Sequence, residues 1–167
     1  MTANILIVDD EKNIREGLRL ALKKDGHNIF LASDGREALT ALQNNEIDAV
    51  ITDLKMPNMD GEQLMKIIIK DYFNVPVIIL TGHGTVEGAV QAMREGAYDF
   101  ITKPLNLDKL SLIVSRALSQ RRLIIENRNL QSKIDNLGKG AIIGKSGKMD
   151  KIFNIIQNVA PTKSSVL

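Results

Sequence analysis

Chemically reactive side chains stand at the ends of four short apolar runs in this sequence. They are three carboxylates, one hydroxyl and one amine: Asp9, Asp10, Asp53, Thr81 and Lys103. The runs are rich in β-branched residues and do not alternate with polar ones, a pattern typical of parallel strands buried on both faces. In an open α/β sheet the carboxyl ends of the strands form the crevice where ligands bind. The sequence therefore predicts one site for phosphate and a divalent metal.

The predicted site has the side chains that phosphoryl transfer needs. Mg²⁺ takes oxygen ligands in octahedral geometry and keeps several waters, so Asp9, Asp10 and Asp53 can hold it with two or three carboxylate contacts. In phosphoryl transfer the protein otherwise positions the groups and neutralises developing charge. Lys103 could serve as a second cation for this purpose, and Thr81 as a hydroxyl donor. A carboxylate beside a metal can also be a nucleophile. Asp53 is the best candidate because it ends the central strand.

Each of these residues has a simpler interpretation when it is taken alone. Acidic residues before a helix, such as Asp9 and Asp10, are commonly caps that interact with the helix dipole. A Lys-Pro pair at Lys103 is typical of a turn, and Thr81 followed by glycine is typical of the start of a loop. The presence of all these residues at successive strand ends is much less common by chance than any one of them alone. We therefore prefer the interpretation that they form a single site.

The elements that must position these residues alternate along the chain. Strands are predicted at residues 4–8, 27–32, 49–52, 77–80 and 98–101. Helices are predicted at residues 11–24, from 35, from 61, at 86–95 and from 108. The helices are indicated by apolar residues at helical spacing, with Asp60 as a cap and Gly96 as a stop. Five βα units in succession imply an α/β fold, a doubly wound five-stranded parallel sheet with helices on both faces.

Composition limits the class of protein. The chain has 167 residues and 44% hydrophobic content, enough for one domain with a substantial core and a remainder. It has no cysteine, which excludes disulfides and zinc–thiolate sites. No apolar stretch approaches the roughly 18 residues of a membrane span, and the first residues leave no room for a signal peptide. We expect a soluble, cytoplasmic protein without a membrane partner.

The net charge of +2 conceals an asymmetry between two parts of the chain. Residues 1–115 carry −5, whereas residues 116–167 carry +7. A basic tail is one indication of nucleic-acid binding. This tail lacks interleaved aromatic residues and a recognisable DNA-reading motif, so we favour a solvated helix face and a linker.

A second pattern begins after about residue 120. Apolar residues, with one asparagine among them, alternate steps of four and three: Leu123, Asn127, Leu130, Ile134 and Leu137. This spacing is typical of the seam of a coiled coil, in which a polar residue can fix a two-stranded register. The spacing predicts a homodimer that pairs through this helix. The glycines at 138 and 140 are predicted to break the helix. The alternative is a single amphipathic helix packed on its own domain.

Residues 1 to about 120 resemble the receiver domain of two-component response regulators. Five motifs carry the resemblance: Val8-Asp9-Asp10-Glu11, Asp53-Leu-Lys-Met-Pro-Asn-Met-Asp-Gly61, Leu80-Thr-Gly82, Gly96-Ala97 and Lys103-Pro104. Together they are highly specific. The resemblance implies a flavodoxin-like sheet with strand order 2-1-3-4-5.

The resemblance also implies roles for the acidic residues. Asp53 would accept a phosphoryl group from a sensor histidine kinase. Asp9 or Asp10, together with Asp53 and the backbone carbonyl of Lys55, would bind Mg²⁺. Such a protein is not an enzyme in the usual sense, because it accepts the phosphoryl group and at most removes it from itself.

Further roles fall on residues around this centre. The resemblance implies that Thr81 and Lys103 contact the phosphoryl group and that Phe100 is the aromatic residue of the conformational switch. Lys55 and His83 each lie two positions after a motif residue, on loops beside the crevice where attacking water must enter. We expect both to tune the lifetime of the phosphoryl group. His83 has an alternative interpretation as a solvated loop residue.

The remainder is similar to the start of the AAA+ domain in sigma-54-dependent activators of the NtrC family. The motifs are Ile142-Ile-Gly-Lys-Ser, Met149 and Val159-Ala-Pro-Thr, with Ser-Val-Leu167 at the end. No Walker A motif is present. We expect a receiver at residues 1–120, a linker or coiled-coil helix at 121–140 and a truncated AAA+ start at 141–167. In a longer protein the partners would include sigma-54 RNA polymerase and DNA.

Three other functions compete with a phosphorylation-dependent response regulator. A receiver that controls a different output is one. A Mg²⁺-dependent phosphatase with an Asp nucleophile is another, disfavoured because such haloacid-dehalogenase-like enzymes carry a second Asp two positions after the nucleophile, where this chain has Lys55. The third is a plain dimerisation module whose acidic site is vestigial.

Overall fold

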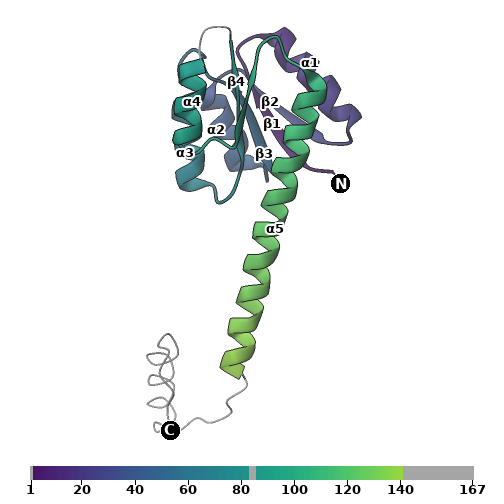
Figure 1. Ribbon diagram of the computed structural model, residues 1–167, viewed down its shortest axis with the longest axis vertical. Coiled ribbons are helices and arrows are strands. Elements are labelled where there is room, and N and C mark those ends of the chain that lie inside the picture. Colours follow the sequence, from purple (N-terminus) through teal and green to yellow (C-terminus); the bar gives the residue numbers. More distant parts are fainter. Residues whose placement is uncertain (1, 83–85, 141–167) are drawn as a thin grey trace. The chain divides into compact units, whose positions relative to one another are not determined.

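One parallel sheet forms the centre of the computed structural model, which describes residues 2–82 and 86–140 (Figure 1). Its strands are β1 (Asn4–Val8), β2 (Asn28–Ala32), β3 (Ala49–Asp53), β4 (Val77–Thr81) and β5 (Asp99–Thr102). Each neighbouring pair is parallel, and the order is β2-β1-β3-β4-β5. The predicted doubly wound sheet and its strand order are therefore confirmed.

Helices follow the strands as the sequence predicts. They are α1 (Lys12–Lys24), α2 (Gly35–Asn44), α3 (Gly61–Asp71), α4 (Val86–Arg94) and α5 (Leu107–Gly140). The break predicted at Gly138-Lys-Gly140 falls on the last residues of α5, which is described as far as Gly140. No helix in the described part of the chain is long and apolar enough to cross a membrane.

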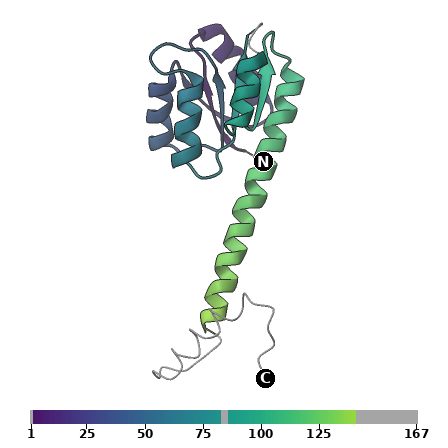
Figure 2. The ribbon, with the colours of Figure 1, turned by 60° about the vertical axis from the view of Figure 1, so that its left-hand side comes forward.

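Two apolar layers hold the helices on the sheet. Successive strand residues point to opposite faces, so neighbours such as Ile5 and Leu6 enter different clusters. One cluster joins the sheet to α2, α3 and α4, and the other joins it to α1 and α5. Figure 1 shows this division, with α3 and α4 on one side of the sheet and α5 on the other, and Figure 2 shows the same ribbon turned by 60°. Both layers leave the carboxyl ends of the strands free for polar residues.

Side-chain caps begin helices α2 and α3. The side chain of Asp34 accepts hydrogen bonds from the backbone N–H groups of Arg36 and Glu37 at the start of α2. The side chain of Asp60 accepts one from the N–H of Gln63 at the start of α3, as predicted. Such caps satisfy N–H groups that have no partner inside the helix. They also fix the loops that lead out of β2 and β3.

The described chain divides into two units within α5, after Glu126. In the first unit, Leu110 and Val114 of α5 are fully buried against the sheet. Further along the helix, the Arg121 guanidinium forms an ion pair with Asp48, which lies just before β3. Contacts between α5 and the sheet domain therefore continue past residue 120.

Candidate functional site

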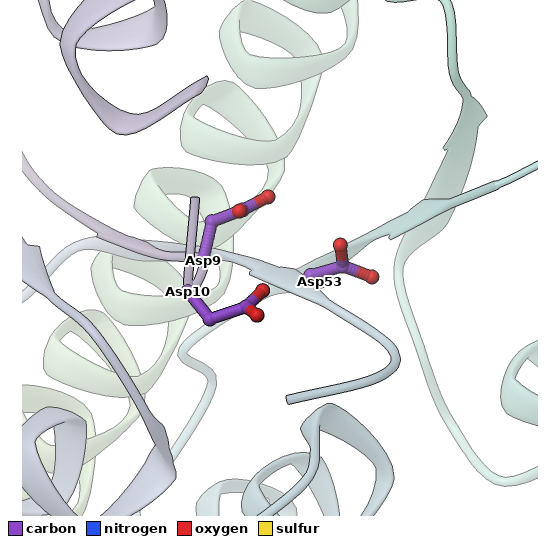
Figure 3. A group of neighbouring side chains, drawn as sticks. All are labelled: Asp9, Asp10 and Asp53. Atoms are coloured by element: carbon purple, nitrogen blue, oxygen red, sulfur yellow. The ribbon is translucent and has the colours of Figure 1, made fainter. Parts of the chain in front are cut away.

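Three carboxylates meet where β1 and β3 end. Val8 of β1 is in register with Thr52 of β3, so the residues after them, Asp9 and Asp53, stand side by side. Asp10 joins them, and one carboxylate oxygen from each residue lies within 4.8 Å of the others. Figure 3 shows the three side chains gathered at these strand ends. The sequence prediction that these residues come together is confirmed.

Asp9 is the most enclosed of the three. Its side chain is 0% exposed, and its Oδ1 accepts a hydrogen bond of 2.8 Å from the backbone N–H of Glu11. Burial raises the pKa of Asp9, because loss of water disfavours the charged form, and the hydrogen bond from Lys103 only partly opposes this. Negative charge is therefore concentrated where it is least solvated, and a cation would relieve it.

Lys103 supplies a cation to this cluster. Its Nζ lies 2.5 Å from Asp53 Oδ2 and 3.0 Å from Asp9 Oδ2, with Glu11 Oε1 at 3.5 Å. Burial alone would lower the pKa of Lys103, but the hydrogen bonds to Asp53 and Asp9 outweigh burial and raise the pKa above its usual value. The ammonium therefore stays charged at any physiological pH and bridges two strand ends.

Backbone pairing brings Thr81 next to Lys103. Thr81 ends β4 in register with Thr102 of β5, and its carbonyl oxygen accepts a 2.7 Å hydrogen bond from the N–H of Lys103. Thr81 is buried, and its hydroxyl lies 3.4 Å from the carbonyl oxygen of Gly82. The predicted hydroxyl and amine thus come from adjacent strand ends beside the carboxylates.

The loop after β3 approaches the cluster through its backbone. The N–H of Lys55 donates to Asp53 Oδ1 at 3.2 Å, while the Lys55 side chain is exposed. Gly61, the first residue of α3, lies against the carbonyl of Asp53, where an added Cβ would overlap that oxygen. A glycine is therefore needed at this close approach, which fixes where the loop returns.

Phe100 lies on the same face of the sheet as Thr81. It is in register with Ile79 of β4, two residues before Thr81, and residues two apart on a strand share a face. Phe100 is half-buried and packs against the cluster that holds α3 and α4. A change near Thr81 can therefore reach this aromatic side chain through packing on one face.

The residues present fit a divalent metal with hard ligands. Three carboxylates offer oxygens within 4.8 Å of one another, and Mg²⁺ prefers oxygen ligands and retains several waters. The raised pKa of the Asp9 carboxyl reflects the cost of keeping its charge buried, and a bound cation would offset this cost. Asp9, Asp10 and Asp53 can therefore hold such an ion.

Other predicted residues lie outside the described part of the chain or at exposed positions of α5. His83 and the AAA+ motifs after residue 140 lie outside the described residues. Of the predicted seam, Leu123, Leu130 and Ile134 are 60%, 50% and 65% exposed. Asn127 is exposed as well, and Leu137 lies in α5, although its side chain is not described.

Sequence reasoning assigned no role to two residues that contact the site. Glu11 faces Lys103, and a guanidinium N–H of Arg15 donates to the carbonyl oxygen of Asp9. The available signal was their spacing: Arg15 follows Glu11 by one helical turn, and its backbone N–H bonds to the Glu11 carbonyl. Both residues steady the turn that presents Asp9 and Asp10.

Comparison with known proteins gives a consistent family. Residues 5–115 match the family model of the response regulator receiver domain. The C4-dicarboxylate transport transcriptional regulatory protein DctD of Pseudomonas aeruginosa is 37% identical over 165 residues, covering 98% of this chain and 36% of that protein. A putative response regulator NtrX-like protein of Rickettsia conorii is 41% identical over 166 residues, covering 98% and 35%. The chain thus spans about a third of the length of these relatives.

Solved structures agree with this match. A crystal structure of NtrX from Brucella abortus in complex with ADP has a TM-score of 0.74 at 37% identity, covering 98% of this chain and 35% of that one. A response regulator receiver domain protein from Clostridium thermocellum has a TM-score of 0.70 at 38% identity, covering 73% and 98%. Both likenesses cover at least 73% of this chain.

Proposed function

This chain belongs to the response regulator receiver domain family, and from that premise we propose that Asp53 accepts a phosphoryl group from a sensor histidine kinase. The observation that carries the proposal is the position of Asp53, whose Oδ2 lies 2.5 Å from the Lys103 ammonium beside Asp9 and Asp10. A carboxylate so placed can act as a nucleophile, with one cation beside it and two carboxylates that would bind a metal ion.

The proposed reaction exchanges one bond to phosphorus for another. An Asp53 carboxylate oxygen attacks the phosphorus of a phosphohistidine, the new P–O bond forms as the P–N bond breaks, and the imidazole keeps the electron pair and takes a proton. Phosphoryl transfer places charge on the equatorial oxygens. Lys103, now 2.5 Å from Asp53, is positioned to follow this charge, with the Thr81 hydroxyl as a further donor.

Mg²⁺ completes the proposed site. The carboxylates of Asp9 or Asp10 and of Asp53, with the carbonyl of Lys55, would hold it. When bound, it would neutralise charge on the phosphoryl oxygens. With an ion held by these carboxylates, Lys103 would be less occupied by Asp9 and could contact the transferred group.

The signal is proposed to leave the site through Thr81 and Phe100. Movement of the Thr81 hydroxyl toward a phosphoryl group would vacate space on the sheet face that Phe100 shares. An aromatic residue that enters this space makes a two-state packing change. The face of α4 and β5 would then present a different surface to a partner.

In a protein as long as these relatives, the receiver is proposed to govern a sigma-54-dependent transcription activator in the cytoplasm. We propose the same division of the chain as before: a receiver at residues 1–120, a linker helix at 121–140 and an AAA+ start at 141–167. The regulated property would be oligomerisation, with homodimers formed through the linker helix. Sigma-54 RNA polymerase and DNA would be contacted by further domains of that protein. The similarity to DctD and NtrX-like regulators supports this output.

Beryllofluoride, a mimic of the phosphoryl group, tests the proposal directly. We expect ¹H–¹⁵N spectra of the parent to change on addition of beryllofluoride and Mg²⁺, with the largest shifts near Asp53, Thr81 and Phe100. Asp53→Asn should not respond, and EDTA should reverse the change in the parent. An equal response of Asp53→Asn, or indifference to EDTA, would reject the assignment.

A further inference from the structure

Two loops from different parts of the chain are fastened together beside the acidic cluster. The Nδ2 of Asn58, in the β3–α3 loop, donates a 2.7 Å hydrogen bond to Asp34 Oδ2, in the β2–α2 loop. The N–H of Gly35 donates a 3.2 Å hydrogen bond to the carbonyl oxygen of Met59. These two hydrogen bonds, which we call the loop clasp, join residues 24 positions apart in the chain.

The Asp34 side of the clasp is rigid. Asp34 Oδ1 accepts from the N–H groups of Arg36 and Glu37, each at 2.9 Å, and only its other oxygen is used by Asn58. Glu37 reaches back to accept from both the N–H and the hydroxyl of Ser33, each at 2.7 Å. The carboxylate that receives Asn58 is therefore held on both sides by the first turn of α2.

The Asn58 side of the clasp requires a particular backbone. Asn58 has a φ of 64°, in the left-handed region that asparagine tolerates better than most residues. Met59 covers Gly35 so closely that a Cβ on this glycine would overlap the methionine side chain. A left-handed residue in an exposed loop persists when its surroundings hold it there, and the clasp is what holds Asn58.

The other end of the same loop is also fixed. The N–H of Gly61 donates to the carbonyl oxygen of Leu54 at 3.0 Å, and Gly61 packs against the carbonyl of Asp53. The loop is thus tied to α3 on one side and to the β2–α2 loop on the other. Lys55 lies between these two attachments. Its carbonyl is the one proposed metal ligand that comes from a loop backbone instead of a side chain.

We infer that Asp34 and Asn58 are positioning residues that hold the Lys55 carbonyl where Mg²⁺ binds, and so set the metal affinity of the receiver. The inference rests on the proposed function. Mg²⁺ demands near-ideal octahedral geometry, so a loop that samples other conformations binds it only in the fraction of molecules that are correctly arranged. Neither residue belongs to the acidic cluster, and each acts through the loop.

Exchange of the two side chains is the sharpest test. In Asp34→Asn, the hydrogen bond to a carboxylate is replaced by at most a weaker amide–amide bond, for which the Asn58 side chain must turn over, and in Asn58→Asp two carboxylates face each other. In the double variant, the Nδ2 of residue 34 can donate to the carboxylate of residue 58, so the hydrogen bond is restored in reverse at unchanged net charge. Asn58→Gly removes the bond while keeping a residue that adopts positive φ.

The measurement is the dissociation constant for Mg²⁺, from ¹H–¹⁵N titrations of the full chain, with the free energy of unfolding as a check that each variant is folded. We expect each single variant and Asn58→Gly to bind Mg²⁺ about tenfold more weakly, the scale for residues that orient metal ligands. The exchanged double variant should return to within about twofold of the parent. Asn74→Gly, at another left-handed asparagine (φ 53°), is the matched control and should bind like the parent.

The two single variants change the net charge in opposite directions. They therefore distinguish an effect of the loop clasp on Mg²⁺ binding from an effect of net charge. Weaker binding in both supports the inference. Weaker binding in Asp34→Asn with tighter binding in Asn58→Asp would mean that charge alone acts, and would overturn it. Parent-like binding by Asn58→Gly would overturn it as well. A parent that binds no Mg²⁺ would instead reject the proposed function on which the inference rests.

Discussion

The ammonium of Lys103 lies 2.5 Å from a carboxylate oxygen of Asp53, although 50 positions separate the two residues in the chain. The same nitrogen is 3.0 Å from the fully buried Asp9. One cation thus balances two carboxylates at the ends of adjacent strands. Since Asp53 is the proposed phosphoacceptor, Lys103 already contacts the carboxylate to which the phosphoryl group would be attached.

Asp9→Asn should make the protein more stable at neutral pH in the absence of Mg²⁺. Burial raises the folded-state pKa of Asp9 above its ordinary 3.8, so its contribution to stability is present at low pH and is lost as pH rises through that pKa. Asparagine carries no such cost. The advantage of the variant should therefore be greatest near pH 7 and shrink as pH falls toward about 4.

Urea unfolding of both proteins across this pH range checks the prediction, with and without Mg²⁺. The difference in unfolding free energy between the two proteins at each pH gives the effect of the Asp9 substitution. Added Mg²⁺ should stabilise the parent more than the variant. A variant that is less stable than the parent at pH 7 would show that the buried carboxylate is favourable as it stands.

Gly61→Ala should damage the fold beside the site. An added methyl group would overlap the Asp53 carbonyl oxygen, so the β3–α3 loop must shift, at a cost of about 3 kcal/mol, the upper end for overpacking. Gly17→Ala is the matched control, since its Cβ meets no atom within 4 Å on an exposed position of α1. It should stabilise by about 0.5–1 kcal/mol. Equal unfolding free energies in the two variants would contradict the described close approach.

Lys55→Ala and His83→Ala should each change the lifetime of the phosphorylated protein. Lys55 is exposed on the loop beside Asp53, where attacking water would enter, and the role of His83 remains a prediction from its place in the sequence. Release of phosphate after removal of the donor gives the lifetime. Lys70→Ala, an exposed lysine on α3, serves as the control and should leave it unchanged. Unaltered lifetimes in both test variants would remove this role.

Leu130→Asp/Ile134→Asp should prevent dimerisation if α5 forms the predicted seam. Both side chains are at least half exposed in the single chain, and burial of such a surface favours pairing at roughly 25 cal/mol per Å² before association costs. Sedimentation analysis gives the mass of parent and variant. Gln131→Asp/Ser132→Asp, on exposed positions outside the seam, is the control. Equal masses for parent and the Leu130/Ile134 variant would place the interface elsewhere.

Strand positions and the acidic cluster could be predicted because they depend on local sequence and one topological rule. Unbroken apolar runs indicate buried parallel strands, and the strand ends then bring Asp9 and Asp53 together. The loop clasp could not be predicted in this way. The sequence marks Asp34 only as a helix start, and its bond to Asn58 depends on how two loops fold over one another.

The ion pair between Arg121 and Asp48 shows the same limit at the other end of the sheet. In the sequence, Arg121 lies two residues before the predicted seam and nothing marks its partner. In the structure it reaches a carboxylate 73 positions away. Long-range partners of single polar residues leave no periodic signal, whereas apolar faces do.

Acetyl phosphate labelling tests the central claim most directly. The parent, incubated with acetyl phosphate and Mg²⁺ and then trapped with borohydride, should carry one modification that peptide mass spectrometry assigns to Asp53. Lys103→Met should reduce the labelling, and EDTA or Asp53→Asn should abolish it. Labelling of Asp9 or Asp10 in the parent, or undiminished labelling of Asp53→Asn, would contradict the account.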